Sequence, residues 1–365
     1  MCYNKKKGKV ICMQQPIIPD YRMGLFKLLR EEWGSDFQIY AGDSAFGGTP
    51  VSATTAWNYF KRVENYYFLG NRFLWQCGCL RHLLFADIAI INSNARILSN
   101  IVVLLLRKLR GRPSILWGHA EGKYISKGLL KSLYLRLGDG FIAYTSSQKE
   151  LMLEEFPYLK VWDAPNACMH SKDCFNTATT LPQVNNFIYV GRLVKAKKVR
   201  LLVDAFLYAK QKKMLSNDVR LVFVGDGDER AVLEKTVEIA GLTNFVDFTG
   251  HIGEPSKLRD LYSKAICSVS PGYVGLSATQ SFSFGVPMLI SRNEFHSPEI
   301  EACIEGFNAE FFESNDLHSL ADGLRLMELN KAATFGTRNE LSKWTAANYS
   351  FEAMRDTFVQ AAGSL

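Results

Sequence analysis

Two kinds of hydrophobic pattern alternate along the 365-residue chain. Short apolar runs predict buried strands, and longer segments with apolar residues every three or four positions predict helices packed against them. In the first part of the chain, strands are expected at 9–14, 37–41, 88–92, 114–118 and 140–144, and helices at 23–33, 95–110, 126–137 and 148–155. Strands separated by helices of this length indicate βαβ units and a parallel sheet.

A second alternating series follows residues 168–184, which lack periodicity and which we interpret as a linker. Its strands are expected at 187–190, 220–224, 246–249, 266–270 and 287–291, its helices at 199–213, 229–240, 254–264 and 277–284, and further helices after 317. The pattern predicts an α/β protein with two doubly wound parallel-sheet domains, 1–167 and 185–348, facing a central cleft. Ligands of such sheets bind beyond the carboxyl ends of the strands, so the chemistry is expected in the loops that follow strands.

Composition narrows the class of protein. Hydrophobic residues make up 47% and charged residues 22%, which is typical of a globular protein and excludes a disordered or collagen-like chain. The basic N-terminus is followed by too short an apolar run for a signal peptide, so a cytoplasmic protein is expected. Most of the eight cysteines are interpreted as buried reduced thiols, with a redox role for Cys77 and Cys79 as the alternative. No spacing suits zinc, and no metal or cofactor is expected.

Charge divides the chain unevenly. Residues 1–163 hold 22 of the 43 Lys and Arg and 13 of the 36 Asp and Glu, a net charge of +9, and the remainder is therefore −2. A basic half joined to a nearly neutral half indicates two surfaces with different partners, although a basic half that is merely soluble is an equal alternative.

Three glycine-containing loops follow strands in the second half. Gly191 opens the first, in which Arg192 and Lys197 precede a helix, a position that suits an anion, whereas Lys195 and Lys198 are interpreted as solvated. The second is Gly225-Asp226-Gly227-Asp228, whose glycines bring backbone near a ligand and whose Asp228 is interpreted as a helix cap. The third, 268–277, again combines a strand, a glycine turn and a helix start. Together the loops indicate a phosphorylated ligand.

The strings in these loops carry a resemblance. The matching segments are Gly191-Arg192-Leu193 with Lys197, 224–227, 248–250, 275–277, 285–290 and 298–306. In this order and spacing, residues 186–327 resemble the donor-binding domain of GT-B glycosyltransferases, specifically the retaining family 4 (glycosyl transferases group 1). The resemblance implies a nucleotide diphosphate sugar as donor, with Arg192 and Lys197 neutralising its diphosphate without a metal. It further implies a donor site built from Gly191, Gly225, Asp226, Gly227, His251, Ile252, Tyr273, Val274, Gly275, Leu276, Ser277 and Gln280.

The chain departs from the family at two positions. The family carries two glutamates eight residues apart, and on this register they fall at Gly272 and Gln280. Gln280 retains hydrogen-bonding capacity for a ribose, but Gly272 has no side chain. Arg292, Glu294 and His296 lie near a strand end and are candidate replacements, with an ordinary loop role favoured for each.

The N-terminal half matches the family less strongly. His119 follows an apolar strand and falls where the family often has a histidine beside the reaction centre, so we assign it a catalytic role, with a structural histidine as an equal alternative. Glu121, Tyr21 and Arg22 are candidates for the acceptor side, and Asp20 is interpreted as a cap. The resemblance also implies that a last helix, 349–365, packs back on this domain.

Two segments of the basic half suit an anionic membrane surface. The first, 96–112, is apolar with a basic end, and a buried helix is the favoured interpretation for its residues 101–106. The second carries basic residues at helical spacing and is the better membrane candidate, with a solvated face as the alternative. These basic residues are Lys123, Lys127, Lys131 and Arg136.

The combined prediction is a cytoplasmic glycosyltransferase, peripheral on the inner face of the cell membrane. It transfers a sugar with retention from a nucleotide diphosphate donor to a lipid-linked or surface-polysaccharide acceptor, such as a lipopolysaccharide or capsule intermediate. No nucleic-acid partner is expected. The alternatives are a non-catalytic or weakly active GT-B subunit that supports a partner, and a sugar-nucleotide epimerase or phosphorylase on the same scaffold.

Overall fold

A computed structural model describes residues 9–46, 58–119, 129–175 and 180–365. The chain divides into two compact units, Met1–Cys168 with Phe351–Leu365, and Met169–Ser350. The division falls at the start of the linker expected over 168–184, whose later residues belong to the second unit. The last segment of the chain belongs to the first unit, where the helix α13 (Phe351–Gly363) packs against α1 (Met23–Trp33).

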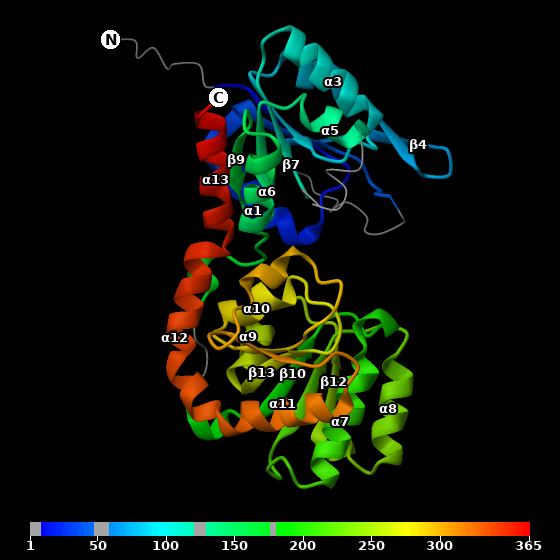
Figure 1. Cartoon of the computed structure of the whole chain (residues 1–365), viewed down its shortest axis with the longest axis vertical. Coiled ribbons are helices and arrows are strands. Elements are labelled where there is room, and N and C mark those ends of the chain that lie inside the picture. Colours follow the sequence, from blue (N-terminus) through cyan, green and yellow to red (C-terminus); the bar gives the residue numbers. More distant parts are fainter. Residues whose placement is uncertain (1–8, 47–57, 120–128, 176–179) are drawn as a thin grey trace. The chain divides into compact units, whose positions relative to one another are not determined.

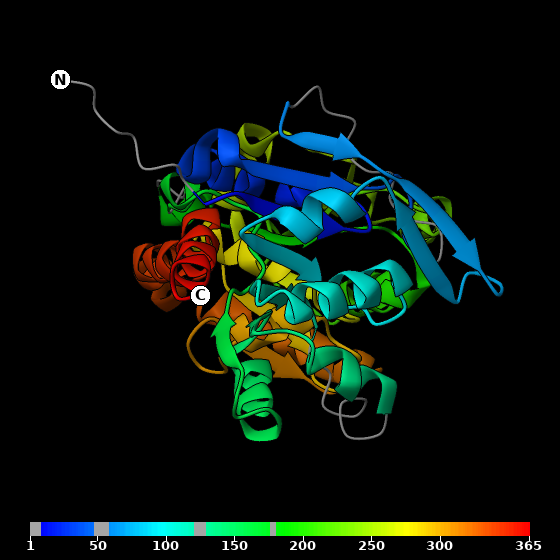
Figure 2. The same ribbon diagram turned by 90° about the horizontal axis from the view of Figure 1, so that it is seen from above.

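The first unit is built on a seven-stranded parallel sheet with the order β3-β2-β1-β6-β7-β8-β9 (Figures 1 and 2). The strands are β1 (Ile11–Gln15), β2 (Phe37–Ala41), β3 (Phe60–Arg62), β6 (Ile88–Asn92), β7 (Ser114–Trp117), β8 (Gly140–Ala143) and β9 (Lys160–Asp163). Because β1 pairs with both β2 and β6, the strand order reverses at β1, where doubly wound sheets open a crevice for ligands.

Successive side chains of the central strands point to opposite faces of this sheet, and each face has its own hydrophobic core. Ile11 and Met13 pack with α1 and α13, whereas Cys12 packs on the opposite face with the other helices. Those helices are α2 (Leu80–Phe85), α3 (Leu98–Leu109), α5 (Leu129–Leu135) and α6 (Ser146–Glu155). Thr145 caps α6, because its hydroxyl accepts the N–H of Gln148 at 3.1 Å.

A small antiparallel hairpin, β4 (Glu64–Phe68) and β5 (Phe73–Cys77), extends from the same unit (Figure 2). Short helical turns η1 (Asp20–Arg22) and η2 (Gly34–Asp36) flank α1. No described helix of the chain is both long enough and apolar enough to cross a membrane.

The second unit repeats the design with a six-stranded parallel sheet, ordered β12-β11-β10-β13-β14-β15. Its strands are β10 (Asn186–Val190), β11 (Arg220–Val224), β12 (Val246–Gly250), β13 (Ala265–Ser270), β14 (Met288–Ser291) and β15 (Ala309–Phe312). Its helices are α7 (Val199–Gln211), α8 (Arg230–Ile239), α9 (Pro255–Ser263), α10 (Ser277–Ser283), α11 (Leu317–Leu329) and α12 (Lys331–Asn348). The short turns are η3 (Ser171–Asp173), η4 (Leu181–Gln183), η5 (Lys195–Lys197), η6 (Thr243–Phe245) and η7 (Pro298–Ala302).

The α/β prediction of two parallel sheets is confirmed, and the differences are local. The helix expected over 95–110 begins only at Leu98, because the Asn94 side chain accepts the N–H of Arg96 and Ile97 remains extended. The hairpin, β3, β9, β15 and α2 were not predicted. The start of the helix expected over 126–137 lies outside the described residues.

Candidate functional site

Two loops of the second unit lock together at the carboxyl ends of β10 and β11. The N–H of Gly191 donates to the carbonyl of Val224 at 2.9 Å, and the N–H of Leu193 donates to the carbonyl of Asp226 at 2.9 Å. Gly225 has a φ of 145°, and a Cβ there would collide with the carbonyl oxygen of Gly191. The glycines of the second loop are therefore needed for packing against the first loop, whereas the sequence suggested approach to a ligand.

The first loop presents its two expected cations differently. Arg192 is exposed, whereas Lys197 is half-buried, with its Nζ donating to the carbonyl of Tyr273 at 2.7 Å and lying 3.3 Å from the centroid of the Tyr273 ring. Burial and, to a smaller extent, the charge of Arg192 lower the pKa of Lys197 to about 8, with Glu299 opposing both effects. An ammonium with only one of its three donors directed at Tyr273 retains hydrogen-bonding capacity for an anion.

Gly272 is enclosed by the backbone of this same loop. A Cβ at Gly272 would lie 2.8 Å from the carbonyl carbon of Lys197 and 2.9 Å from its oxygen, closer than real Cβ atoms approach. The position that carries a glutamate in the resembling family therefore has no room for any side chain here unless the Lys197 backbone moves. The Lys197 backbone occupies the space that a side chain at position 272 would need, so the position of Lys197 and the absence of a carboxylate at 272 go together.

His296 is the candidate replacement that reaches the third loop. Its Nδ1 accepts the N–H of Val274 at 3.0 Å, and burial lowers its pKa, which favours the neutral ring that this acceptor requires. The Val274 amide, expected to face the donor, therefore already has a partner. His296 thus positions the loop that the resemblance assigns to the donor sugar.

The other two candidate replacements are engaged elsewhere. Glu294 pairs with Lys198 at 2.5 Å, so the interpretation of Lys198 as a solvated cation is wrong. Arg292 forms ion pairs with Glu305 at 2.8 Å and with Glu313 at 3.5 Å.

The remaining donor-side residues lie at the same edge of the sheet. Gln280 is half-buried, with its Oε1 3.4 Å from the Tyr262 hydroxyl that donates to it. A small cavity is lined by Lys197, Tyr262 and Ser277, among others, so it brings the first loop together with the start of α10. Gly275 and Leu276 immediately precede that helix.

The second loop and the residues after β12 are more open. Asp226 is exposed, and its carboxylate accepts the N–H of Gly227 at 2.8 Å and pairs with Arg230 at 3.1 Å, contacts that lower its pKa. The interpretation of Asp228 as a cap is wrong, because Glu229 is the cap residue of α8 and no side chain caps it. His251 is exposed and Ile252 half-buried directly after β12.

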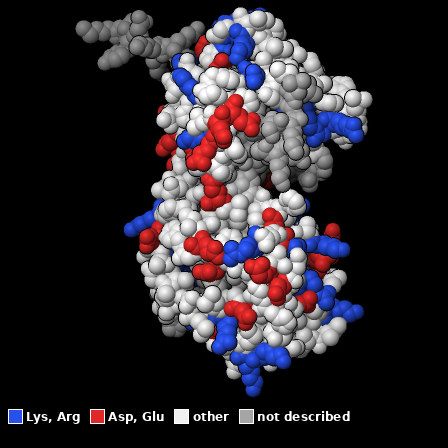
Figure 3. Space-filling model, in the orientation of Figure 1, with Lys and Arg blue, Asp and Glu red and all other residues white. Residues whose placement is uncertain are grey.

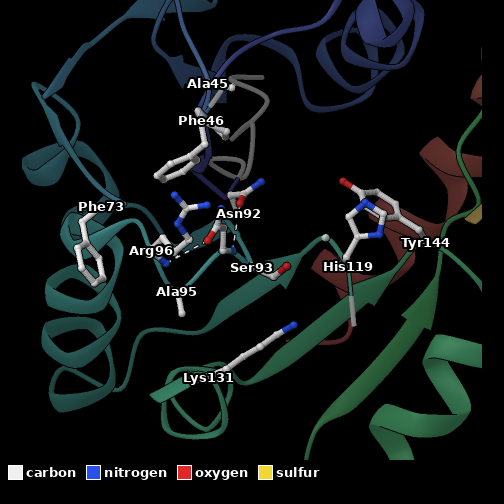
Figure 4. A pocket seen from close by; sticks show the side chains of 13 residues that line it. Ala45, Phe46, Phe73, Asn92, Ser93, Ala95, Arg96, His119, Lys131 and Tyr144 are labelled. Atoms are coloured by element: carbon white, nitrogen blue, oxygen red, sulfur yellow. Dashed lines mark hydrogen bonds between the residues drawn. The ribbon is translucent and has the colours of Figure 1, made fainter. Parts of the chain in front are cut away.

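The first unit holds a cavity of about 810 Å³ at the carboxyl ends of β1, β6, β7 and β8 (Figure 4). Its lining combines aromatic rings, amides and two cations: Pro16, Ala45, Phe46, Phe73, Asn92, Ser93, Asn94, Ala95, Arg96, Gly118, His119, Lys131 and Tyr144. His119 is exposed, and its ring lies 4.6 Å from that of Tyr144, edge to face. Aromatic faces beside amides and cations suit a sugar that carries an anionic group.

Arg22 does not line this cavity. Its side chain is buried, with Nη2 donating to the Tyr144 hydroxyl at 2.6 Å and the guanidinium lying 4.3 Å from the Trp117 ring centroid. Arg22 therefore supports the cavity wall through Tyr144. Tyr21 is exposed beside it, and Asp20 forms no capping hydrogen bond, contrary to its interpretation. Glu121 lies outside the described residues, as do Lys123 and Lys127.

Sequence reasoning missed the amides behind the cavity. Gln14 and Asn92 interact at the ends of β1 and β6, where the Asn92 N–H donates to Gln14 Oε1 at 3.2 Å and the Asn100 amide donates to the same oxygen at 2.8 Å. Arg96 was likewise missed as a lining residue; it lies 4.0 Å from the Phe46 ring and donates to the carbonyl of Arg72 at 2.6 Å. The available signal was polar residues directly after buried strands, at the position where the strand order reverses.

The comparisons with known proteins define the class. Residues 178–347 match the family of glycosyl transferases group 1. HepE of Anabaena, solved in complex with UDP, has a similar fold with a TM-score of 0.67 and 14% identity, over 98% of this chain and 100% of that chain. The lipopolysaccharide outer core galactosyltransferase WaaB has a TM-score of 0.66 and 13% identity, over 97% of this chain and 99% of that chain.

Sucrose-phosphate synthase from Thermosynechococcus elongatus is also similar, with a TM-score of 0.64 and 16% identity, over 97% of this chain and 98% of that chain. No curated protein sequence matches the chain. The fold is therefore that of the GT-B class. The family match covers residues 178–347, a little under half of the chain and within the second unit, and together with the fold it supports a glycosyltransferase.

Proposed function

We propose that this glycosyltransferase moves a sugar, with retention of configuration, from a nucleotide diphosphate sugar to a lipid-linked or surface-glycan acceptor. The observation that carries the proposal is the pair Arg192 and Lys197 on one strand-end loop, with the ammonium of Lys197 held at 2.7 Å from a neutral carbonyl. HepE, which shares the fold, was solved with UDP. A uridine nucleotide is therefore the first donor to test.

The chemistry assigned to the second unit is stabilisation of the departing nucleoside diphosphate. Two cations placed where negative charge develops lower the barrier most when they are preorganised, and the contact of Lys197 with Tyr273 preorganises one of them. Arg192 is exposed and can add bidentate hydrogen bonds to phosphate oxygens. These charges serve the role that a metal ion has in other transferases, so the proposal includes no metal.

The chemistry assigned to the first unit is recognition of the acceptor. Its cavity of about 810 Å³ has the size of a small-molecule site and offers ring faces, amides and the cations Arg96 and Lys131. An acceptor with an anionic phosphate group fits this lining. His119 on the cavity wall is proposed to hydrogen-bond a reacting hydroxyl or to share its proton.

Location follows from the acceptor. We propose a cytoplasmic protein that is peripheral on the inner face of the cell membrane, where a lipid-linked acceptor resides. The basic balance of residues 1–163 supports this location, because anionic lipids attract such a surface.

The first experiment measures binding of UDP, GDP and dTDP sugars by calorimetry. Arg192→Ala and Lys197→Ala are expected to weaken binding, each by roughly tenfold or more, because each removes a charge-assisted hydrogen bond. Lys195→Ala is the matched control, since Lys195 is an exposed cation on the same loop. Failure of every nucleotide to bind, or equal binding in all three variants, would contradict the site.

The second experiment measures transfer and separates the remaining candidate. Gly272 favours a non-catalytic subunit as the second candidate function, because a side chain is sterically excluded where the resembling family has a glutamate. Product formation from the donor that binds most tightly, with the anomeric configuration of the product read by NMR, supports the enzyme with retention. Tight nucleotide binding without hydrolysis or transfer supports the subunit.

A further inference from the structure

The helix α3 is apolar on two opposite sides. Val103 and Leu104 are buried against the sheet, as expected for residues 101–106. The expectation is wrong for Val102, Leu105 and Leu106, which are 38%, 47% and 37% exposed. Leu109 is 83% exposed, so four outward residues at positions i, i+3, i+4 and i+7 form one apolar stripe on the helix.

Neighbouring helices extend this stripe. Phe85 at the end of α2 is 60% exposed, and the Arg110 guanidinium lies 5.1 Å from its ring centroid. Leu133 of α5 is 51% exposed, and the end of α3 is tied to the end of α5 by Lys108 Nζ, which donates to a carbonyl oxygen of that segment at 2.9 Å. We call the six exposed residues the α3 surface: Phe85, Val102, Leu105, Leu106, Leu109 and Leu133.

The helices that carry the α3 surface contribute basic charges only, and the nearby Asp87 is paired with Arg112 at 3.2 Å. The helices α2, α3 and α5 contain no Asp or Glu, whereas Arg81, Lys108 and Arg110 are exposed on or directly after them. Figure 3 shows uncharged surface over α3 with Lys and Arg side chains beside it. Arg107 does not belong to this set, because it is fully buried and donates to backbone carbonyls.

We propose that the protein docks on an anionic lipid bilayer through the α3 surface, with α3 lying in the plane of the interface. Leucines inserted among lipid headgroups and flanking cations paired with lipid phosphates satisfy both parts of this surface. A protein partner would have to combine an apolar groove with acidic side chains in one place. An anionic bilayer presents apolar acyl chains and negatively charged headgroups over its whole surface.

The geometry connects docking with the acceptor cavity. Lys131 lines the cavity and lies on α5, the same helix that carries Leu133 of the α3 surface. The proposal deepens the proposed function, in which the acceptor is lipid-linked, because it places the bilayer beside the acceptor cavity. The sequence favoured the basic residues of 123–136 as the membrane contact, and this stays a prediction because Lys123 and Lys127 lie outside the described residues. The exposed leucines add α3 as the surface that we propose.

The test is flotation of the full chain with vesicles of phosphatidylcholine alone or with 30% phosphatidylglycerol. The variant Leu105→Gln/Leu109→Gln is expected to lower the partition coefficient on anionic vesicles by at least tenfold, because burying one leucine is worth about tenfold in an equilibrium constant. The matched control is Leu326→Gln/Leu329→Gln on α11, where exposures of 45% and 69% resemble those of the first pair. This control is expected to float like the wild type.

A second variant keeps the proposal falsifiable if the first is poorly folded. Arg81→Gln/Arg110→Gln is expected to lower binding to anionic vesicles by roughly fivefold per residue, with weaker dependence on salt. Unchanged thermal unfolding and nucleotide binding, measured on every variant, identify the folded proteins.

The proposal is overturned if wild-type protein does not float with anionic vesicles, or if both leucine pairs lower flotation equally. It is also overturned if sedimentation shows a dimer that Leu105→Gln/Leu109→Gln dissociates while vesicle binding is absent, because the α3 surface would then join two copies. Flotation without any sugar transfer would leave docking intact and contradict the proposed function. Sugar transfer without flotation would support the transferase activity and contradict docking through the α3 surface.

Discussion

Replacing Gly272 with alanine adds a single methyl group at the junction of two functional loops. The added Cβ would lie 2.8 Å from the carbonyl carbon of Lys197 and 3.0 Å from the carbonyl oxygen of Ala196. Both obstacles are backbone atoms, which cannot rotate away as a flexible side chain can. The change therefore pushes on the backbone that holds the Lys197 ammonium.

The expected cost follows from this geometry. Adding one methyl to a closely packed site costs about 1–3 kcal/mol. For a domain of the size of the second unit, this corresponds to a fall in melting temperature of roughly 2–10 °C. If Lys197 is displaced from its contact with the Tyr273 carbonyl, nucleotide affinity falls as well, by roughly tenfold, the value of one charged hydrogen bond.

The assay pairs thermal unfolding with calorimetry for the nucleotide that the wild type binds. Gly336→Ala is the matched control, because Gly336 lies exposed in α12 and a Cβ there would meet no atom within 4 Å. This control is expected to stabilise the protein by about 0.5–1 kcal/mol, since alanine favours a helix over glycine, and to leave affinity unchanged.

Two results would refute the reasoning. The first is a Gly272→Ala variant with wild-type stability and wild-type affinity, which would mean that the loop yields at no cost. The second is a Gly272→Glu variant that binds the donor more tightly than the wild type, because the position would then accept the carboxylate that its surroundings exclude.

Three further predictions concern buried polar groups. Burial lowers the pKa of Lys197 to about 8, so its ammonium loses its proton as the pH rises from 7 to 9.5. Nucleotide affinity measured by calorimetry is therefore expected to fall across this range. Lys197→Met should show no such fall. Arg107→Met leaves buried carbonyls without a donor and is expected to lower the free energy of unfolding by about 3 kcal/mol. Urea titration measures this change. The control Lys108→Met, at an exposed position, is expected to change it by less than about 0.5 kcal/mol. His296→Ala removes the acceptor of the Val274 N–H, so it is expected to cost about 1–3 kcal/mol of stability and to weaken donor binding. Equal melting temperatures for the variant and the wild type would contradict this expectation.

Local pattern was sufficient for most of the two sheets. The helix Met23–Trp33 and the strands Phe37–Ala41, Ile88–Asn92 and Arg220–Val224 have the predicted bounds, because each buries one side or both and its apolar spacing records this. The β4–β5 hairpin was missed because each of its strands is defined by its cross-strand partner and only partly by burial.

Some features of the candidate site were likewise predictable from the sequence, and others were not. That Arg192 and Lys197 belong to a strand-end loop was predictable from glycine, cation and strand in succession, and the cavity of the first unit lies at the expected edge of its sheet. The sequence does not indicate that Arg22 is buried beneath Tyr144 while Arg192 is exposed, since both are arginines near the end of a strand.

Local sequence pattern was enough to predict the alternation of strands and helices, the two units and the resemblance of residues 186–327 to a glycosyltransferase family. The packing of distant segments was needed to explain why Gly272 is a glycine, to show which cations remain accessible, and to show that α3 presents leucines outward. The physical reason is that periodicity and loop composition report contacts within a few residues, whereas the space around Gly272 is defined by Lys197, 75 positions earlier in the chain.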